Sequence, residues 1–324
     1  MPSENNKILI TGTSGFIGFH LAKSFLEEGA EVVGIDNFNG YYSINLKESR
    51  NEILEDFKGF QGIRMNLCDY ESLLELFSRE SFEKVCHLAA QPGVRYSLSH
   101  PFAYQKSNLE SFLNVLEACR HSKVKRLVFA SSSSVYGNNK QLPFSEEDSV
   151  DHPVSLYAAT KKANELMAHA YHQLYGFQTI GLRFFTVYGP WGRPDMASWM
   201  FTDAILNDRP IKVFNQGNMR RDFTYIDDII QGVRAALLKE DLDPFEIFNL
   251  GNHQSENLMD FINLIGRELG KSPEMELLPM QAGDVETTYA DITKAREKLG
   301  FEPKTPIEKG IPEFITWFKN YNNL

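Results

Sequence analysis

The segment Lys7-Ile-Leu-Ile-Thr-Gly-Thr-Ser-Gly-Phe-Ile-Gly18 decides the fold of this chain. Its apolar residues at positions 8–10 predict a short buried strand of a parallel sheet. Three glycines follow at the spacing G-x-x-G-x-x-G, and residues 20–28 then show the apolar periodicity of a helix. The order of strand, glycine turn and helix predicts a cradle for the diphosphate of a dinucleotide.

Each glycine of this turn has its own expected task. Gly12 permits the tight turn, Gly15 lets the main chain approach a diphosphate, and Gly18 lets the helix lie close to the strand. A second strand, over residues 30–35, ends at Asp36. An acidic side chain at that place accepts hydrogen bonds from an adenosine ribose 2′-hydroxyl and repels a 2′-phosphate, so NAD is predicted rather than NADP.

The first half of the chain alternates strand and helix patterns. Strands are expected over residues 8–10, 32–35, 62–65, 84–88, 126–130 and 177–182, and helices over residues 71–79, 101–121 and 156–175. This alternation predicts an α/β fold with a Rossmann-type, doubly wound parallel sheet. Ligands are expected at the carboxyl ends of the strands, near the point where the strand order reverses.

The alternation breaks up after Arg183. Short helices are expected over residues 197–206, 258–269 and 306–321, and isolated strands over residues 212–214, 246–249 and 275–278. We therefore expect an NAD-binding Rossmann domain over residues 1–183, with later crossover segments. A smaller C-terminal α/β substrate-binding lobe is expected mainly over residues 184–324.

Composition excludes several classes of partner. The 324 residues include 33 Lys and Arg against 43 Asp and Glu, and a net charge of -10 argues against nucleic acid or an anionic membrane. Residues 1–6 form no apolar signal-peptide core, and no run approaches the roughly 20 apolar residues of a membrane span. Cys68, Cys86 and Cys119 are predicted to be reduced packing residues of a cytoplasmic protein. The scattered histidines predict no metal site.

A second motif, Tyr157-Ala-Ala-Thr-Lys161, lies in an expected helix. Residues four apart share one helix face, so Tyr157 and Lys161 should point together toward the carboxyl edge of the sheet. Lys161 can bind the nicotinamide ribose there. Its charge, together with that of NAD+, is expected to lower the pKa of the phenol, so that Tyr157 acts as a general base near neutral pH.

A run of small hydroxyl residues, Ala130-Ser-Ser-Ser-Ser-Val-Tyr-Gly137, ends the fifth expected strand. In an extended chain Ser132 and Ser134 lie on one side, and we favour them as partners of a sugar hydroxyl or of the Tyr157 oxygen. Ser133 is the alternative. Some of these serines are also explained simply as small residues that let the main chain approach a cofactor.

These motifs, with Arg183-Phe-Phe-Thr-Val-Tyr-Gly-Pro190, resemble the extended short-chain dehydrogenase/reductase family, and within it the nucleotide-sugar epimerases. Four further segments are similar to those of UDP-glucuronate 4-epimerases: Asp36-Asn-Phe-Asn-Gly-Tyr-Tyr-Ser-Ile-Asn-Leu-Lys47, Ala89-Ala-Gln-Pro-Gly-Val-Arg-Tyr-Ser97, Tyr188-Gly-Pro-Trp-Gly-Arg-Pro-Asp-Met196 and Met280-Gln-Ala-Gly-Asp284. The resemblance spans about residues 7–320. It also implies a homodimer, for which the long helices over residues 101–121 and 156–175 would supply the seam.

The resemblance implies functional residues as well. Those that hold NAD, with the glycines of the turn included, are Gly12, Gly15, Phe16, Ile17, Gly18, Asp36, Asn37, Asn66, Leu67, Leu88, Ala89, Ala90, Asn108, Tyr157 and Lys161. Arg221 resembles the family arginine on the UDP diphosphate, and Asp284 the acid that holds the uridine ribose. Gln281 and Thr186 stand where many relatives that use glucose or galactose carry Arg and Asn, which disfavours simple UDP-galactose epimerisation.

The implied reaction is redox chemistry at one sugar carbon. Tyr157 takes the proton of the 4-hydroxyl while C4 gives hydride to NAD+, and the 4-keto sugar then turns and accepts hydride on its other face. A 4-keto sugar with a C5 carboxylate is a β-keto acid, and it loses CO2 unless the carboxylate is anchored out of alignment. Arg193 and Thr186 are the candidate anchors, aided by Arg95 and Ser97, because arginine offers a bidentate fork.

The absence of certain acidic residues further limits the reactions that are expected. Related 4,6-dehydratases and decarboxylases carry acids where this chain has Ser133 and Ser134, so a second acid–base group is lacking there. The expected function is therefore 4-epimerisation of UDP-glucuronate to UDP-galacturonate without decarboxylation. The alternatives are a 4-epimerase of UDP-glucose or a UDP-N-acetyl sugar, a UDP-glucuronate decarboxylase and, in a different class, a non-catalytic NAD-binding protein.

Overall fold

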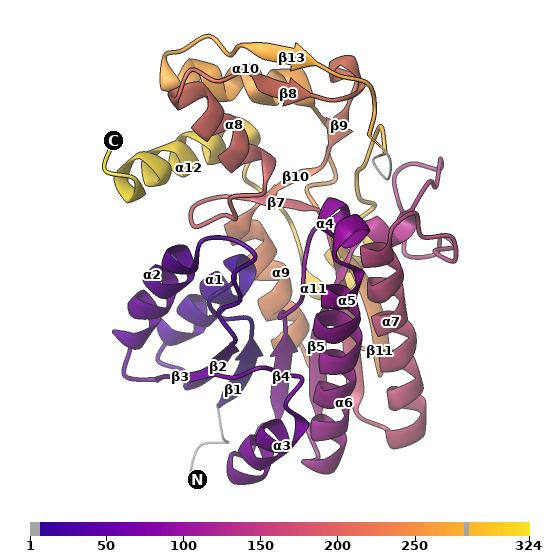
Figure 1. The fold of residues 1–324 in the computed structure, drawn as a ribbon. Coiled ribbons are helices and arrows are strands. Elements are labelled where there is room, and N and C mark those ends of the chain that lie inside the picture. Colours follow the sequence, from indigo (N-terminus) through magenta and orange to yellow (C-terminus); the bar gives the residue numbers. More distant parts are fainter. Residues whose placement is uncertain (1–6, 282–284) are drawn as a thin grey trace.

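A seven-stranded parallel sheet forms the centre of the computed structural model, which describes residues 7–281 and 285–324 (Figure 1). Its strands are β1 (Ile8–Thr11), β2 (Val32–Asp36), β3 (Phe60–Arg64), β4 (Lys84–His87), β5 (Arg126–Ser132), β6 (Gln178–Phe184) and β11 (Phe245–Leu250). The strand order β11-β6-β5-β4-β1-β2-β3 reverses between β1 and β4. This is the doubly wound arrangement that the sequence predicts, and a ligand crevice is expected at the reversal.

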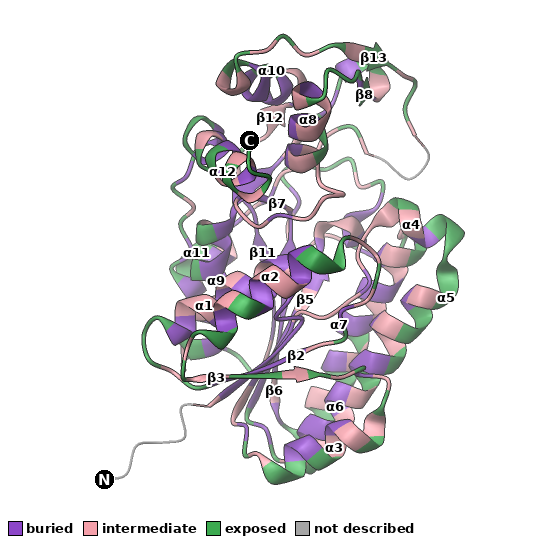
Figure 2. Ribbon diagram, turned by 60° about the vertical axis from the view of Figure 1, so that its left-hand side comes forward, coloured by how far each residue is buried: buried purple, intermediate pink, exposed green. Residues whose placement is uncertain are grey.

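Helices cover both faces of the sheet because neighbouring strand residues point to opposite sides. Ile8 and Ile10 belong to one buried core, whereas Leu9 between them belongs to the other. The first core contains residues of α1 (Phe16–Leu26), α2 (Ile44–Glu55), α9 (Ile226–Leu238) and α11 (Thr293–Leu299). The second contains residues of α3 (Tyr70–Arg79), α6 (Ser111–His121) and α7 (Leu156–Tyr175). Figure 2 shows the central strands between the two helix layers in the colour of buried residues, whereas the edge strand β3 is exposed or half-buried.

The expected elements agree with the structure except in three places. The six strands expected in the first half are all present, each within two residues of its expected ends. The long helix expected over residues 101–121 is divided into α5 (Pro101–Tyr104), a π-helical turn η1 (Gln105–Glu110) and α6, and a short helix α4 (Val94–Ser99) precedes it. Helices α2, α9 and α11 were not expected. The strand expected over residues 246–249 is not isolated in the second lobe, because it pairs with β6 and extends the main sheet.

A second lobe lies over the carboxyl ends of the strands (Figure 1). Its helices α8 (Ala197–Leu206), α10 (Leu258–Leu269) and α12 (Ile307–Tyr321) match the expected ranges within one residue. Three two-stranded sheets complete it: β7 (Thr186–Tyr188) with β10 (Phe223–Tyr225), β9 (Arg220–Arg221) with β12 (Glu256–Asn257), and β8 (Ile211–Val213) with β13 (Met275–Leu277).

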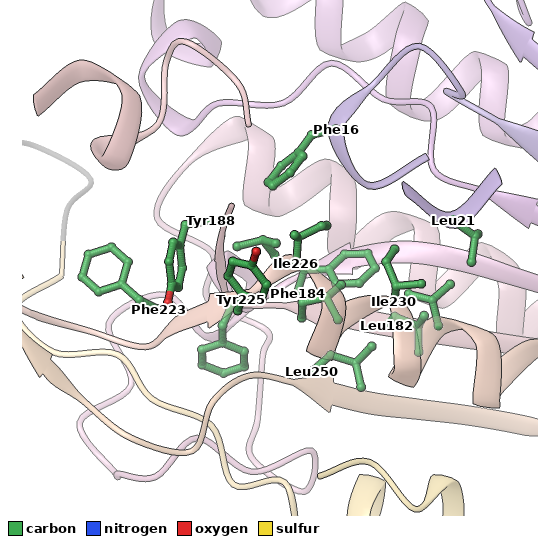
Figure 3. Close-up of a cluster of buried hydrophobic side chains, with 14 of the residues drawn as sticks. Phe16, Leu21, Leu182, Phe184, Tyr188, Phe223, Tyr225, Ile226, Ile230 and Leu250 are labelled. Atoms are coloured by element: carbon green, nitrogen blue, oxygen red, sulfur yellow. The ribbon is translucent and has the colours of Figure 1, made fainter. Parts of the chain in front are cut away.

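One continuous apolar core joins the lobe to the sheet. Figure 3 shows Phe16 of α1 and Leu182 of β6 in the same cluster as Tyr188 of β7 and Tyr225 of β10. Each fully buried side chain of this size contributes roughly 1.5–3 kcal/mol to folding. Because the core passes from one part to the other without interruption, it fixes the walls of the crevice between them.

The cysteines agree in part with the expectation of packing residues. All three are free, and Cys86 and Cys119 are buried, whereas Cys68 is half-buried. Across residues 7–281 and 285–324, every helix is too short or too polar to cross a membrane. The cytoplasmic location expected from the sequence stays a prediction.

A buried ion pair binds α7 to the sheet. Arg183 of β6 donates from Nε to Glu165 Oε1 at 2.8 Å and from Nη2 to Oε2 at 2.9 Å. Ser131 of β5 donates to the same carboxylate at 2.6 Å, and Arg183 Nη1 donates to the Tyr136 hydroxyl at 3.0 Å. Lys161, one turn earlier on α7, donates to Ala130 O at 2.8 Å. These contacts set the position of the face of α7 that carries Tyr157.

Replacing Glu165 by Gln should destabilise the protein strongly. The change leaves the Arg183 guanidinium buried without its counter-charge, which typically costs about 3–5 kcal/mol in free energy of unfolding. The matched change Glu83→Gln breaks an exposed pair with Lys125 and should cost about 1 kcal/mol or less. Urea unfolding of both variants measures the difference. An equal loss of unfolding free energy in the two variants would show that the buried Glu165–Arg183 pair does not hold α7 on the sheet.

His87, the last residue of β4, should lower the free energy of unfolding at acidic pH. It is buried, its Nδ1 lies 2.9 Å from Thr11 Oγ1, and burial lowers its pKa to about 3. The unfolded chain binds this proton near pH 6.5, so the group removes stability as pH falls from 6.5 toward 3, by about 1.4 kcal/mol per pH unit. In urea unfolding, the destabilisation caused by His87→Asn should therefore be about 2 kcal/mol smaller at pH 5 than at pH 7. An identical loss at both pH values would contradict this assignment.

Candidate active site

The turn between β1 and α1 has the geometry expected from its glycines. Gly12 has φ +79°, and a Cβ there would lie 2.9 Å from Ala89 N. A Cβ on Gly18 would lie 2.0 Å from Gly12 O. Both positions therefore exclude any side chain, as predicted for a tight turn against which the helix packs closely.

Asp36 is held beside this turn at the end of β2. Its Oδ2 accepts a hydrogen bond from Ser14 N at 3.1 Å, and its Oδ1 accepts one from Phe38 N at 2.8 Å. A carboxylate has about four acceptor sites, so two main-chain bonds leave capacity for further donors. Because Asp36 also lines the central cavity, it can accept hydrogen bonds from ribose hydroxyls.

One cavity of about 670 Å³ runs along the carboxyl ends of the strands, from Asp36 to Tyr157. Its walls include Gly12, Gly15, Phe16, Ile17, Gly18, Asp36, Asn37, Asn66, Leu67, Leu88, Ala89, Ala90, Tyr157 and Lys161, which are all the expected NAD-binding residues except Asn108. The amide of Asn108 is instead engaged inside the protein, where it donates to Gln91 O and Thr160 Oγ1 and accepts from Gln91 N. It supports the cavity wall without lining it.

Tyr157 and Lys161 lie in the first turns of α7. The side chain of Ser155 caps this helix by accepting a hydrogen bond from Ala158 N at 3.1 Å. The Lys161 ammonium is buried and donates to Ala130 O, while Tyr157 faces the cavity from the same helix side. The i, i+4 spacing therefore brings both side chains to the cavity, as expected.

The electrostatics of Tyr157 are those of a buried phenol. Burial raises the pKa of its hydroxyl, and this outweighs the lowering by a hydrogen bond with Ser132 and by the Arg193 guanidinium. Burial also lowers the pKa of Lys161, to about 8. The lowered phenol pKa expected from the sequence depends on the charges of Lys161 and NAD+ together, and it stays a prediction for the NAD-loaded protein.

The serine run is only partly extended. Strand β5 ends at Ser132, and a 3₁₀ turn η2 (Ser133–Tyr136) follows, so the strict alternation stops there. Ser132 Oγ nevertheless lies 3.2 Å from Ser134 Oγ, which confirms that these two hydroxyls lie on one side. All four serines of the run line the cavity, and the Ser131 hydroxyl donates to Glu165.

The substrate residues expected near the reacting sugar are mostly brought together. Arg193, Thr186, Arg95 and Ser133 line the cavity with Tyr157. Ser97 does not: it is buried, and its hydroxyl donates to Val94 O at 2.6 Å within its own helix. A serine in a short helix often satisfies its hydroxyl in this way, which the motif alone does not reveal.

Two of the residues expected on the nucleotide end, Arg221 and Gln281, do not line the cavity. Arg221 of β9 donates from Nη1 to Arg220 O at 2.8 Å and to Glu286 O at 2.9 Å. Gln281 is half-buried and does not line the cavity. Asp284 lies outside the described residues. Within the described ranges there is also no group of three or more His, Cys, Asp or Glu side chains arranged to hold a metal ion.

Two side chains without an expected role fix the loop that carries Arg193. Arg50 of α2 is fully buried and donates to Ser14 O, to the Tyr42 hydroxyl and to the carbonyls of residues 191 and 192. His20 Nε2 lies 2.9 Å from Pro190 O. The loop is thereby tied to the glycine turn. The signal was present in the sequence, because Leu46, Arg50 and Leu54 lie at i, i+4 and i+8 and place an arginine on an apolar helix face.

Tyr41 and Asp195 also line the sugar end of the cavity and were not expected there. Asp195 binds Arg193 through two hydrogen bonds of 3.0 Å, and the Tyr41 hydroxyl donates to Asp195 at 3.1 Å. Both residues lie in segments that resemble the UDP-glucuronate 4-epimerases. The resemblance alone assigned them no task.

Comparisons with known proteins place this site in a family. The model of the NAD dependent epimerase/dehydratase family matches residues 8–251. A probable UDP-glucuronate 4-epimerase of Rhizobium meliloti is 43% identical over 333 residues, covering 97% of this chain and 98% of that protein. UDP-glucuronate 4-epimerase 4 of Arabidopsis thaliana is 44% identical over 337 residues, covering 98% of this chain and 77% of that protein.

A solved structure agrees with the sequence comparisons. UDP-glucuronic acid 4-epimerase from Bacillus cereus, in complex with UDP-glucuronic acid and NAD, is 36% identical. Its TM-score with this chain is 0.92, and the match covers 97% of this chain and 99% of that one. With the glycine turn, the Tyr157–Lys161 pair and a family match over most of its length, this chain belongs to the NAD dependent epimerase/dehydratase family, within the extended short-chain dehydrogenases/reductases.

Proposed function

We propose that this protein epimerises UDP-glucuronate to UDP-galacturonate at C4 without decarboxylation. The broader activity, that of an NAD-dependent UDP-sugar 4-epimerase, follows from its family and from relatives that match nearly the whole chain. The observation that supports the uronate substrate is the position of Arg193, which lies close enough to Tyr157 to lower its pKa. A guanidinium beside the reacting phenol suits a sugar that carries a carboxylate.

The residues that line the cavity suit NAD. The side-chain-free turn leaves the start of α1 open to a diphosphate, and Asp36 keeps acceptor capacity for an adenosine ribose. Lys161 lies at the other end, beside the expected nicotinamide ribose. When bound, NAD+ accepts the hydride of C4 and returns it, so that no external oxidant is consumed.

Tyr157 moves the proton of the sugar 4-hydroxyl. Burial keeps the phenol protonated in the protein alone, so deprotonation is favoured only when a positive charge enters the cavity beside it. When the Ser132 hydroxyl donates to the phenolate it stabilises the negative charge, and Ser134 N holds that hydroxyl in place by donating to Ser132 Oγ at 3.2 Å. The same phenol returns the proton when the C4 oxygen is again a hydroxyl.

The carboxylate at C5 must be held still while C4 is a ketone. If the C5–C6 bond lines up with the carbonyl π system, its electron pair moves into the carbonyl and C6 leaves as CO2. Arg193 and Thr186 line the cavity where they can prevent this alignment. Ser133 and Ser134 stand where an acid–base group for further chemistry would be needed, and serine cannot supply one at neutral pH.

Incubation with UDP-glucuronate tests this proposal. Purified protein without added NAD should convert UDP-glucuronate to a mixture with UDP-galacturonate, measured by chromatography of the released sugars. Preferential turnover of UDP-glucose or of a UDP-N-acetyl sugar would overturn the uronate assignment. Stoichiometric CO2 with reduced cofactor left on the protein would instead identify a decarboxylase.

The Tyr157→Phe variant tests the proton carrier. Without the hydroxyl, turnover of UDP-glucuronate should fall by about 10²–10⁴-fold or more, while NAD still copurifies. Tyr175→Phe at the far end of the same helix is the matched control and should keep wild-type turnover. Full activity of the Tyr157 variant would rule out this general base.

We further propose that the protein forms a homodimer through α6 and α7. The two helices lie side by side at one edge of the molecule (Figure 1), with their inner residues packed on the sheet. Leu113 of α6 and Leu166 of α7 are exposed by 41% and 58%, so a second apolar face remains beyond the core. Four helices from two copies would bury it.

A charge in this face should separate the copies. Leu166→Glu places a charge in the proposed seam of both subunits, so sedimentation at micromolar protein concentration should give a monomer. The control Leu238→Glu changes a leucine at the end of α9, exposed by 43%, and should leave a dimer. A wild-type protein that sediments as a monomer would refute the seam.

A further inference from the structure

The guanidinium of Arg193 is held along one of its edges. Its Nε donates to Asp195 Oδ1 at 3.0 Å, and its Nη2 donates to Asp195 Oδ2 at 3.0 Å. The Tyr41 hydroxyl donates to the same Oδ2 at 3.1 Å. Within the described ranges, Arg193 Nη1 has no hydrogen-bond partner, and Nη2 makes one further contact, to Met196 Sδ at 3.3 Å.

A guanidinium can hold two carboxylates at once. One edge consists of Nε and one Nη group, and the other consists of the two Nη groups. Asp195 occupies the first edge. On the second edge Nη1 has no partner within the described ranges, and the remaining hydrogen of Nη2 contacts only the weak thioether acceptor of Met196. This edge can therefore take a stronger acceptor, because the Arg193 side chain is 22% accessible and lines the cavity together with Tyr157.

We propose that Tyr41 and Asp195 are positioning residues that turn the free edge of Arg193 toward the carboxylate of a uronate sugar. This inference rests on the proposed function, in which Arg193 binds that carboxylate. Asp195 balances the charge of Arg193 before substrate enters, so the guanidinium needs no other anion to stay in the cavity. The fork is then oriented in advance, and binding does not have to order it.

Tyr41 reaches Asp195 from a distant part of the chain. It lies in the loop after β2, 154 residues away in sequence. Its ring packs edge-on against Tyr96 with 4.9 Å between the ring centroids, and a Cβ on Gly93 would lie 2.6 Å from its hydroxyl. Burial and the Asp195 carboxylate raise the pKa of Tyr41, so the phenol stays a hydrogen-bond donor at neutral pH. The acid is therefore held by both lobes.

Loss of this orientation has a specific chemical consequence. A carboxylate that swings during the 4-keto stage can align the C5–C6 bond with the carbonyl. The C5–C6 electron pair then forms an enolate, CO2 leaves, and a proton adds to C5. The sugar remains a 4-keto pentose on UDP, and the two electrons taken from C4 stay on the cofactor. The amount of CO2 released therefore counts the turnovers in which the C5–C6 bond became aligned with the carbonyl.

The experiment measures the fraction of turnovers that end in CO2, with NAD-loaded protein and UDP-glucuronate. Asp195→Asn should raise this fraction about tenfold relative to wild type, which corresponds to roughly 1.4 kcal/mol of lost orientation. Tyr41→Phe should raise it less, and Asp195→Glu should restore part of the wild-type value. Affinity for UDP, which lacks the glucuronosyl group and its carboxylate, should not change. The matched control is Asp203→Asn. Asp203 lies on α8 and forms an exposed ion pair with Arg209, so this variant should behave as wild type.

The Arg193→Met variant separates this inference from the proposed function. If Arg193→Met raises the CO2 fraction but Asp195→Asn and Tyr41→Phe do not, the positioning role is wrong and the uronate anchor stands. If Arg193→Met leaves both the CO2 fraction and the KM for UDP-glucuronate unchanged, the anchor itself is wrong and the inference falls with it. A change in UDP affinity equal to the change in uronate affinity would indicate a merely structural effect and would also overturn the inference.

Discussion

The contact of one face of α7 with the carboxyl ends of β5 and β6 is the constraint on which the site depends. Lys161 reaches the Ala130 carbonyl, and one turn later Glu165 forms a buried ion pair with Arg183. A buried pair of this kind contributes more to specificity than to net stability, since its charges must first lose water. Here it fixes the rotation of the helix, and therefore the direction in which Tyr157 points.

The charges of the cavity are arranged locally within an acidic protein. The chain has a net charge of -10, yet Arg193 and Lys161 both line the cavity together with Tyr157. Burial raises the pKa of Tyr157 above that of a free phenol, whereas the Arg193 guanidinium lowers it. These opposing effects act on the phenol that we propose as the proton carrier.

Local patterns led correctly to much of the fold and of the cavity wall, because they depend on neighbours in the chain. The glycine turn needs only a short stretch of sequence, and the Tyr157–Lys161 pair follows from helix periodicity. Ser97 and Asn108 show where such reasoning stops. Ser97 lies in a family-like motif and Asn108 was expected at NAD from the resemblance. The polar group of each is nevertheless engaged inside the protein, that of Ser97 by Val94 O and that of Asn108 by Gln91 and Thr160. A motif shows which residue is present, whereas hydrogen-bond satisfaction depends on everything packed around it.

The sequence alone was thus enough to predict the parallel sheet, the dinucleotide turn and the position of Tyr157 and Lys161 on one helix face. Each of these features follows from the spacing of residues that are close together in the chain. Contacts across long sequence distances came only from folding in three dimensions. Arg50 donates to the carbonyls of a loop about 140 residues further along the chain, and β11 pairs with β6 at the edge of the central sheet. The Tyr41 hydroxyl donates to Asp195, which is 154 residues away in sequence. The hydrophobic periodicity of the sequence does not predict these contacts, because they depend on how loops pack on the folded core.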